Sequence, residues 1–208
     1  MANAIQRQGG LAGCDHAAGL GGTITSWQSV IKVNRSGTVE LLNALLPVTN
    51  AGAAVVCIAS QAAYFWVSAV TPEIHQILAD AWAPDMVDRL TASLRVEILD
   101  GVTAYGLSKY GVLQIVRKRA HEFGQRSGRL VCLSPGIIET PMAEAEMKEH
   151  QEAMQDIIDN TPVGGRRGRP EEIAAVAGFL CSPAASFVAG GDILLDGGST
   201  QQVLLETA

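Results

Sequence analysis

The sequence predicts an α/β protein in which helices cover the faces of a parallel sheet. Short apolar runs alternate with longer stretches of helical periodicity. The runs are continuously apolar, as strands covered on both faces are. The clearest is Ala53 to Ala59, and Leu130 to Leu133 and Ile193 to Leu195 have the same character. Gly13 to Ala18 predicts a weaker strand, because polar residues interrupt it.

Three segments between these strands have the pattern of amphipathic helices. In Ser26 to Leu46, apolar residues recur at mostly helical spacing, and Pro47 ends the run. Tyr105 to Phe123 carries an apolar face. Pro170 is followed by two glutamates, which is typical of a helix start because acids there face the positive end of the helix dipole. We expect this last helix to reach Leu180.

Residues 64–101 form an insertion before the long helix that carries Tyr105. The insertion holds apolar residues at helical spacing, and Pro84 divides it, so we expect two amphipathic helices. Extra packing or an oligomer contact is one interpretation, and a substrate lid is the functional alternative. The apolar residues that define the two helices are Ile74, Ile77 and Leu78, then Met86, Leu90 and Leu94.

Composition excludes several classes of protein. The 208 residues suffice for one domain, 1–208, and the net charge of −6 provides no global basic field for nucleic acid or an anionic membrane. No apolar run approaches the roughly 18 residues of a membrane span, and no secretory signal is visible at the start. The four cysteines match no zinc spacing or small disulfide framework. We therefore expect a cytoplasmic protein without a metal site.

Three sites carry candidate chemistry. Tyr105 and Lys109 lie four apart on one helix face, where an ammonium favours the phenolate and lowers the tyrosine pKa. Ser60 follows the best strand, and ligands of open α/β sheets bind at the carboxyl ends of strands. Ser134 to Pro141 follows another strand and can present backbone groups to a planar amide. Each site alone also fits a structural role, such as a solvated tyrosine or a helix cap.

In their order along the chain, these residues resemble the short-chain dehydrogenase/reductase family from about Leu11 to Gly198. Ala18-Gly19 resembles the family's N-N-A-G turn, and Asn34 with Gly37 resembles its N-x-x-G motif. The remaining matches are Ser60, Tyr105 and Lys109 at catalytic positions, Pro135-Gly136 with Thr140, Gly164 to Arg166, Pro170 to Ile173, Phe179-Leu180, Ser182 to Ser186 and Asp196 to Gly198.

The resemblance implies a Rossmann-like fold and hydride transfer between NAD or NADP and a secondary alcohol or ketone, such as a steroid. Tyr105 would be the general acid/base, and Lys109 would bind the nicotinamide ribose and lower the tyrosine pKa. Ser60 would hydrogen-bond the substrate oxygen, and Asn34 would organise a water relay to Lys109. Homodimers or homotetramers would form through the helices containing Asn34 and Tyr105. The implied cofactor contacts are Gly19, Tyr105, Lys109, Pro135, Gly136, Ile138 and Thr140.

Three details are similar to the bacterial 3α-hydroxysteroid dehydrogenase/carbonyl reductase branch: Ala18 to Gly21, Val116 to Ala120 and the insertion before Tyr105. The family's T-G-x-x-x-G-x-G turn, which holds the cofactor pyrophosphate, does not occur before Gly13. We therefore expect an N-terminally truncated form, in which the family's sheet order 3-2-1-4-5-6-7 is reduced to 4-5-6-7. Gly13 to Ala18 would then be an edge strand.

This expectation leaves the function open between several hypotheses. The chain is an oxidoreductase that is truncated or whose start is misplaced, a short form that holds only the nicotinamide half of the cofactor, or a catalytically inactive binding or regulatory subunit or gene fragment. The choice between NAD and NADP cannot be read. A basic loop is predicted from Arg166, Arg167 and Arg169. The simpler interpretation is a solvated turn, and the alternative is a contact with a phosphate group.

Overall fold

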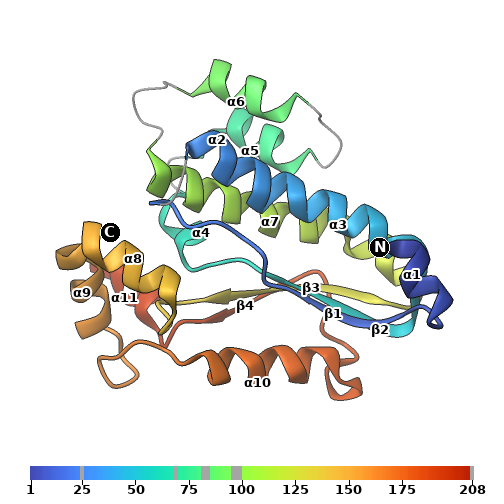
Figure 1. Ribbon diagram of the computed structural model, residues 1–208. Helices are drawn as coiled ribbons and strands as arrows, with labels where there is room; N and C mark the ends of the chain where they lie inside the picture. The colour runs from blue at the N-terminus through green and yellow to red at the C-terminus, as the bar shows by residue number, and fades with distance from the viewer. Residues whose placement is uncertain (24–25, 68–69, 81–84, 95–99, 207–208) are drawn as a thin grey trace.

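The computed structural model describes residues 1–23, 26–67, 70–80, 85–94 and 100–206. Its centre is a parallel sheet of four strands in the order β1-β2-β3-β4, with helices on both faces (Figure 1). The α/β class, the strand order and the place of the first strand at an edge are therefore confirmed. The strands are β1 (Leu11–His16), β2 (Thr49–Ile58), β3 (Arg129–Pro135) and β4 (Asp192–Leu195).

The first strand begins and ends two residues earlier than predicted. Leu11 is buried and pairs with Thr49, which extends the ladder toward the N-terminus. After His16, which pairs with Cys57, the chain leaves the sheet. The segment from Ala17 onward is thereby freed to run over the carboxyl ends of the strands, where ligands of such sheets bind.

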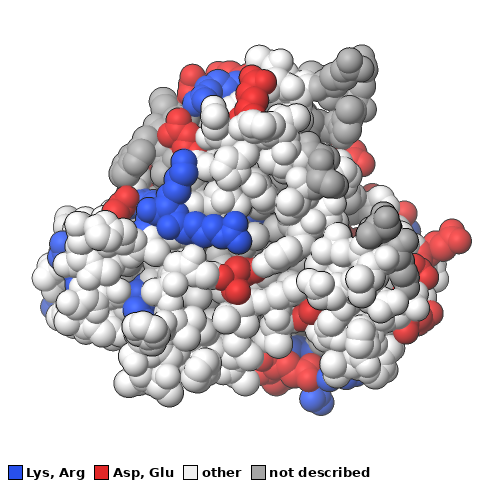
Figure 2. Space-filling view, turned by 180° about the vertical axis from the view of Figure 1, so that it is seen from behind, with Lys and Arg blue, Asp and Glu red and all other residues white. Residues whose placement is uncertain are grey.

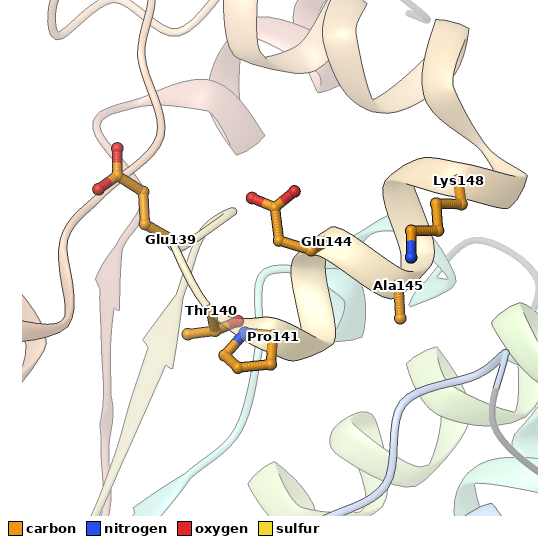
Figure 3. A pocket seen from close by; sticks show the side chains of 6 residues that line it. All are labelled: Glu139, Thr140, Pro141, Glu144, Ala145 and Lys148. Atoms are coloured by element: carbon orange, nitrogen blue, oxygen red, sulfur yellow. The ribbon is translucent and has the colours of Figure 1, made fainter.

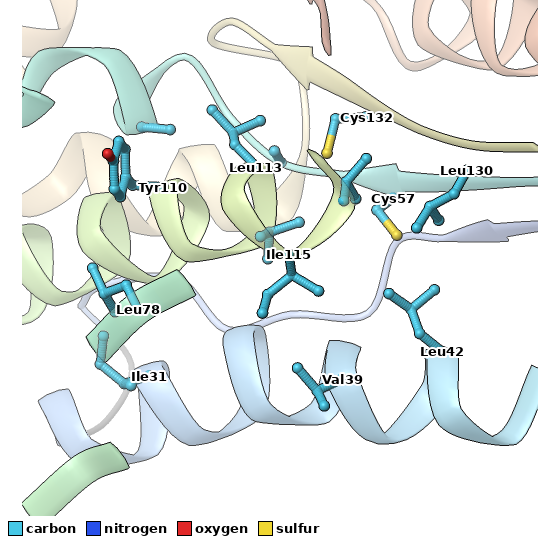
Figure 4. Close-up of a cluster of buried hydrophobic side chains, with 14 of the residues drawn as sticks. Ile31, Val39, Leu42, Cys57, Leu78, Tyr110, Leu113, Ile115, Leu130 and Cys132 are labelled. Carbon is cyan, nitrogen blue, oxygen red and sulfur yellow. The ribbon is translucent and has the colours of Figure 1, made fainter. Parts of the chain in front are cut away.

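The larger core lies between the sheet and the helices above it in Figure 1. Apolar side chains from helices and strands meet there, among them Leu42, Ile115 and Leu130, which are all fully buried (Figure 4). Burial of this apolar surface is the main driving force of folding. The covering helices are α2 (Trp27–Ile31), α3 (Gly37–Leu45) and α7 (Gly101–Gly124), and α1 (Ala2–Arg7) packs at their end.

Among the described residues, one long helix covers the opposite face of the sheet (Figure 1). It is α10 (Pro170–Cys181), one residue longer than predicted. Its Ala177 and Leu180 pack with Val131 and Leu133 of β3 in a second, smaller apolar cluster. The continuous apolar character of the strands is explained by these two clusters, one on each face.

The predicted helix from Ser26 to Leu46 is not one uniform α-helix. A π-helical segment, Lys32–Ser36, separates α2 from α3, and a 3-10 turn, Leu46–Val48, follows. The π turn contains Asn34 and Arg35, both buried. π-Helical turns occur mostly as local bulges at functional sites. Helical periodicity in the sequence does not distinguish the two kinds of turn.

The insertion contains the two predicted helices, α5 (Pro72–Ala79) and α6 (Met86–Ser93), preceded by a short α4 (Ala62–Phe65). Pro84, which was expected to divide them, lies outside the described residues. In Figure 1, α5 and α6 lie above α2 and α7, and α5 packs directly on α7. The insertion therefore adds a further layer to the larger core.

Three helices that the sequence reading did not predict gather beyond the carboxyl ends of the strands, at the left of Figure 1. They are α8 (Pro141–Glu149), α9 (Gln151–Asp159) and α11 (Ser199–Glu206). No helix within the described ranges is both long and apolar enough to cross a membrane. Figure 2 shows the back of the molecule, where the largest group of basic side chains lies left of the centre, smaller basic and acidic groups lie nearer the edges, and much of the surface is uncharged.

Candidate active site

Helix α7 positions the two residues on which the candidate chemistry centres. The helix begins at Gly101, four residues before the predicted start, and the side chain of Asp100 caps it by accepting from the Thr103 amide at 2.7 Å. Tyr105 and Lys109 therefore lie in the helix body, one turn apart. The Lys109 Nζ lies 5.6 Å from the centre of the Tyr105 ring and donates to the Ile58 carbonyl at 2.9 Å.

Ser60 lies just beyond the end of β2 and is buried. Its Oγ accepts from the Ala62 amide at 3.2 Å, so the hydroxyl also caps the turn that leads into α4. The same side chain hydrogen-bonds Tyr105. The hydroxyls of Ser60 and Tyr105 thus lie together at the carboxyl end of the sheet, as a pair that polarises a carbonyl oxygen would.

Asn34 holds the loop after β1 rather than lining the cavity. Its Oδ1 accepts from the Leu20 amide at 2.7 Å, and its Nδ2 donates to the Leu20 carbonyl at 2.9 Å and to Ser108 Oγ at 3.1 Å. The π turn directs this side chain toward both the loop and α7. A Cβ on Gly19 would lie 3.1 Å from Asn34 Oδ1 and 3.6 Å from Lys109 Nζ, so a larger residue there would press on the Asn34 amide.

The loop after β3 brings the other predicted cofactor contacts to the same place. Pro135, Gly136, Ile138 and Thr140 all line the cavity that Tyr105 and Lys109 face. Thr140 Oγ1 accepts from the Ala143 amide at 3.2 Å and caps α8. The loop is therefore shaped by the start of a helix that the sequence reading missed, although the Thr140-Pro141 pair is a typical start signal.

The cavity itself has a volume of about 640 Å³ and lies at the carboxyl ends of the strands. Phe65 and Trp66, at the start of the insertion, form part of its wall. No described residue of α5 or α6 lines it, but Asp100 at the end of the insertion does. The packing interpretation and the substrate-lid alternative for the insertion therefore both stay predictions. Helices α8 and α9 add further apolar residues to the wall, among them Met142, Met154 and Ile157.

Burial changes the acid–base behaviour of both α7 residues. It lowers the pKa of Lys109 to about 8, because the ammonium loses hydration. Burial raises the pKa of Tyr105 to about 12, the hydrogen bond with Ser60 opposes this rise, and the charge of Glu146 adds to it. The direction is therefore opposite to the expected lowering, because desolvation is the largest of these influences on the tyrosine pKa.

The basic loop is paired with acids in the described structure. Arg166 forms an ion pair with Glu172 at 2.8 Å, and Arg167 forms one with Glu144. Figure 3 shows the shallow pocket of about 550 Å³ beside this loop, where Glu139 and Glu144 project to the same side. These pairings favour the solvated-turn interpretation over a phosphate contact. Nowhere among the described residues do three or more His, Cys, Asp or Glu side chains gather as a metal site would require.

Comparison with known proteins shows which families and proteins this chain is similar to. A family profile described as Enoyl-(Acyl carrier protein) reductase matches residues 89–200. The 3-alpha-hydroxysteroid dehydrogenase/carbonyl reductase of Comamonas testosteroni is 35% identical over 193 residues, which are 91% of this chain and 72% of that protein. A short-chain dehydrogenase/reductase of Alternaria brassicicola is 32% identical over 193 residues, 92% of this chain and 69% of that protein.

A solved structure agrees with these sequence matches. The 3-alpha-hydroxysteroid dehydrogenase from Pseudomonas sp. B-0831, crystallised with NADH, is 28% identical, with a TM-score of 0.82 over 99% of this chain and 79% of that chain. The predicted family and its likeness to the 3α-hydroxysteroid dehydrogenase/carbonyl reductase branch are confirmed. The chain belongs to the short-chain dehydrogenase/reductase family of NAD(P)-dependent oxidoreductases.

Proposed function

We propose that this chain interconverts a secondary alcohol and an apolar ketone, such as a steroid or another hydrophobic carbonyl compound. The observation that supports this most directly is the meeting of Tyr105, Ser60 and Lys109 at one apolar cavity. Tyr105 passes a proton to the substrate oxygen in reduction and takes it in oxidation. Ser60 donates a hydrogen bond to that oxygen and holds it beside the phenol.

The residues around Lys109 fit the nicotinamide end of the cofactor. Gly19 leaves open the space that a Cβ would fill next to the Lys109 ammonium, which can then reach a ribose hydroxyl. Bound there, the nicotinamide supplies or accepts the hydride. The choice between NAD and NADP stays open. The residues that would hold this end are Gly19, Tyr105, Lys109, Pro135, Gly136, Ile138 and Thr140.

Asn34 acts on the site through its neighbours. Its side chain makes three hydrogen bonds, two to Leu20 in the loop after β1 and one to Ser108. The backbone carbonyl of Asn34 accepts a hydrogen bond from Thr38 Oγ1 at 2.6 Å. We assign Asn34 as a positioning residue that keeps Gly19 close to Lys109. We also propose that Asn34 organises a water relay to Lys109.

The experiment that tests this function compares two phenol deletions on the same helix. With NADH or NADPH and a panel of apolar ketones, the wild-type chain should show carbonyl reduction. Tyr105→Phe should lower kcat/KM by about a thousandfold, because the proton donor is lost. Tyr110→Phe is the matched control, since its hydroxyl contacts His75 at 2.7 Å and lies outside the cavity.

Equal losses in Tyr105→Phe and Tyr110→Phe would contradict the acid/base assignment. A folded wild-type chain with no turnover for any ketone or alcohol, with either cofactor, would favour the alternative of a catalytically inactive binding or regulatory subunit. Circular dichroism of both variants separates loss of the proton donor from loss of the fold.

A further inference from the structure

A carboxylate from α8 forms part of the cavity wall that faces the substrate. Glu146 Oε1 accepts from the Gly22 amide at 3.0 Å, which ties α8 to the loop after β1. A Cβ on Gly21 would lie 2.8 Å from the same oxygen, so the loop packs closely against the carboxylate. The position of this negative charge is thus fixed by two segments that are distant in the sequence.

The residues that line the cavity carry more negative than positive charge. Asp100 and Glu146 both line it, as does His150, and among the described lining residues Lys109 is the only lysine or arginine. The Lys109 ammonium donates to the Ile58 carbonyl beside the β2 strand end. The charge of Glu146 acts on Tyr105, whose pKa it raises, so it extends to the reacting hydroxyl.

The apolar surroundings reduce the screening of the Glu146 charge. Phe65, Trp66, Met142 and Met154 also line the cavity and make much of its lining apolar. A charge beside apolar side chains is screened less than one in water, and so it acts over a longer distance. An anionic substrate in this cavity would lose hydration and share the cavity with two carboxylates.

We propose that Glu146 is a specificity-determining residue, which makes the cavity favour uncharged apolar carbonyl compounds and reject those that carry a carboxylate. This inference rests on the proposed function and names the substrate class by its charge. A purely structural role for Glu146 is the competing explanation. In that case a glutamine would serve equally well, because its amide oxygen also accepts from the Gly22 amide.

Calorimetric titration of the full chain with two naphthalene compounds of equal size tests the proposal. At about pH 8 the naphthoate is ionised and the naphthalene carboxamide is neutral. The wild-type chain should bind the carboxamide about tenfold more tightly than the naphthoate, because repulsion at a low effective dielectric is of that order. Glu146→Gln should reduce this ratio to about threefold or less by strengthening naphthoate binding alone.

Glu149→Gln is the matched control, because Glu149 is exposed on the same helix and does not line the cavity. It should keep the wild-type ratio. In the wild-type chain, naphthylmethylammonium should bind at least as tightly as the carboxamide. This third probe tests the proposal even if Glu146→Gln does not fold.

A ratio that is the same in wild type and Glu146→Gln would overturn the proposal and leave the proposed function standing. An ammonium probe that binds no better than naphthoate would overturn it as well. If none of the probes bound the wild-type chain, the proposal would fail together with the cavity as a ligand site. Turnover of apolar ketones with a nicotinamide cofactor would then decide separately on the proposed function.

Discussion

At the scale of single residues, the site buries the Lys109 ammonium, which is unfavourable for folding. Lys109 is buried in α7, and its pKa falls from the usual 10.5 to about 8. Between these two values the unfolded chain binds more protons than the folded chain, so the free energy of unfolding rises with pH across that window. Below about pH 8 the full cost of the buried ammonium is present. Such a cost is typical of a functional group rather than a structural one.

Replacing this lysine should therefore stabilise the protein at neutral pH while removing its function. For Lys109→Met we expect the free energy of unfolding at about pH 7 to rise by roughly 1–2 kcal/mol. The relieved charge burial is on the order of 2–3 kcal/mol, and the lost hydrogen bond to Ile58 offsets about 1 kcal/mol. Denaturant unfolding measures this change.

Lys118→Met is the control for that experiment, because Lys118 lies exposed on the same helix. Its effect should stay within about 0.5 kcal/mol. The stabilisation by Lys109→Met should also shrink as the pH rises from about 8 to 10.5, as the wild-type lysine loses its proton in the folded state. A destabilised Lys109→Met at neutral pH would contradict the assigned burial cost.

At the scale of elements, the π turn between α2 and α3 serves two neighbours at once. Asn34 faces the loop after β1, and Arg35, 1% exposed, faces the insertion. Arg35 Nε donates to the Leu78 carbonyl at 3.2 Å, and its Nη2 donates to the Asp80 carbonyl. These carbonyls lie at the C-terminal end of α5, where helices leave carbonyl groups without intrahelical partners.

We predict that Arg35→Met loosens α5 selectively. The carbonyls of Leu78 and Asp80 would lose their buried donor, which costs on the order of 1–3 kcal/mol. Relative to the wild type, amide hydrogen exchange should speed up more in Pro72–Ala79 than in α10. Arg89→Met is the control: Arg89 pairs with the Asp80 carboxylate at 3.2 Å but is 39% exposed, and such surface pairs contribute little. Equal effects of the two variants would contradict the role of Arg35.

The elements also show how far sequence reasoning reaches. Strands such as Thr49–Ile58 were found because burial on both faces makes them continuously apolar. Tyr105, Lys109 and Ser60 were predicted as site residues from their spacing and from the family resemblance, and the structure brings them to one cavity. The π turn was missed because the sequence reading assumed one helical period throughout, whereas in the structure Val33 is 42% exposed and the polar Asn34 and Arg35 are buried. Helices α8 and α9 were missed because they are short and mostly exposed, and Glu146 was missed with them.

At the scale of the whole molecule, the insertion changes which surface is open to a partner. The sequence reading placed self-association on the helices that contain Asn34 and Tyr105. In the structure α5 packs on α7 and Arg35 ties α5 to the π turn, so the chain's own insertion covers part of that face. Near the opposite face, Phe179 is 48% exposed and Phe187 is fully exposed. Exposed aromatic side chains of this kind are typical of protein contacts.

We therefore expect a homodimer or homotetramer whose contact includes the α10 side. Sedimentation velocity of the wild-type chain should show a mass of at least a dimer, and Phe187→Ser should shift it toward the monomer. Val67→Ser is the control, because Val67 is 49% exposed at the start of the insertion. A monomeric wild-type chain would contradict the prediction of an oligomer. A Phe187→Ser variant that still associates would place the contact elsewhere.

The measurement that tests the central claim most directly is calorimetric titration of the chain with NADH and, separately, with NADPH. The account predicts that at least one of them binds and that Lys109→Met weakens this binding by about tenfold or more, as the loss of a buried ammonium contact should. Lys118→Met should bind as the wild type does. If neither compound bound, or if Lys109→Met bound as tightly as the wild type, the cavity of Tyr105 and Lys109 would not be the cofactor site.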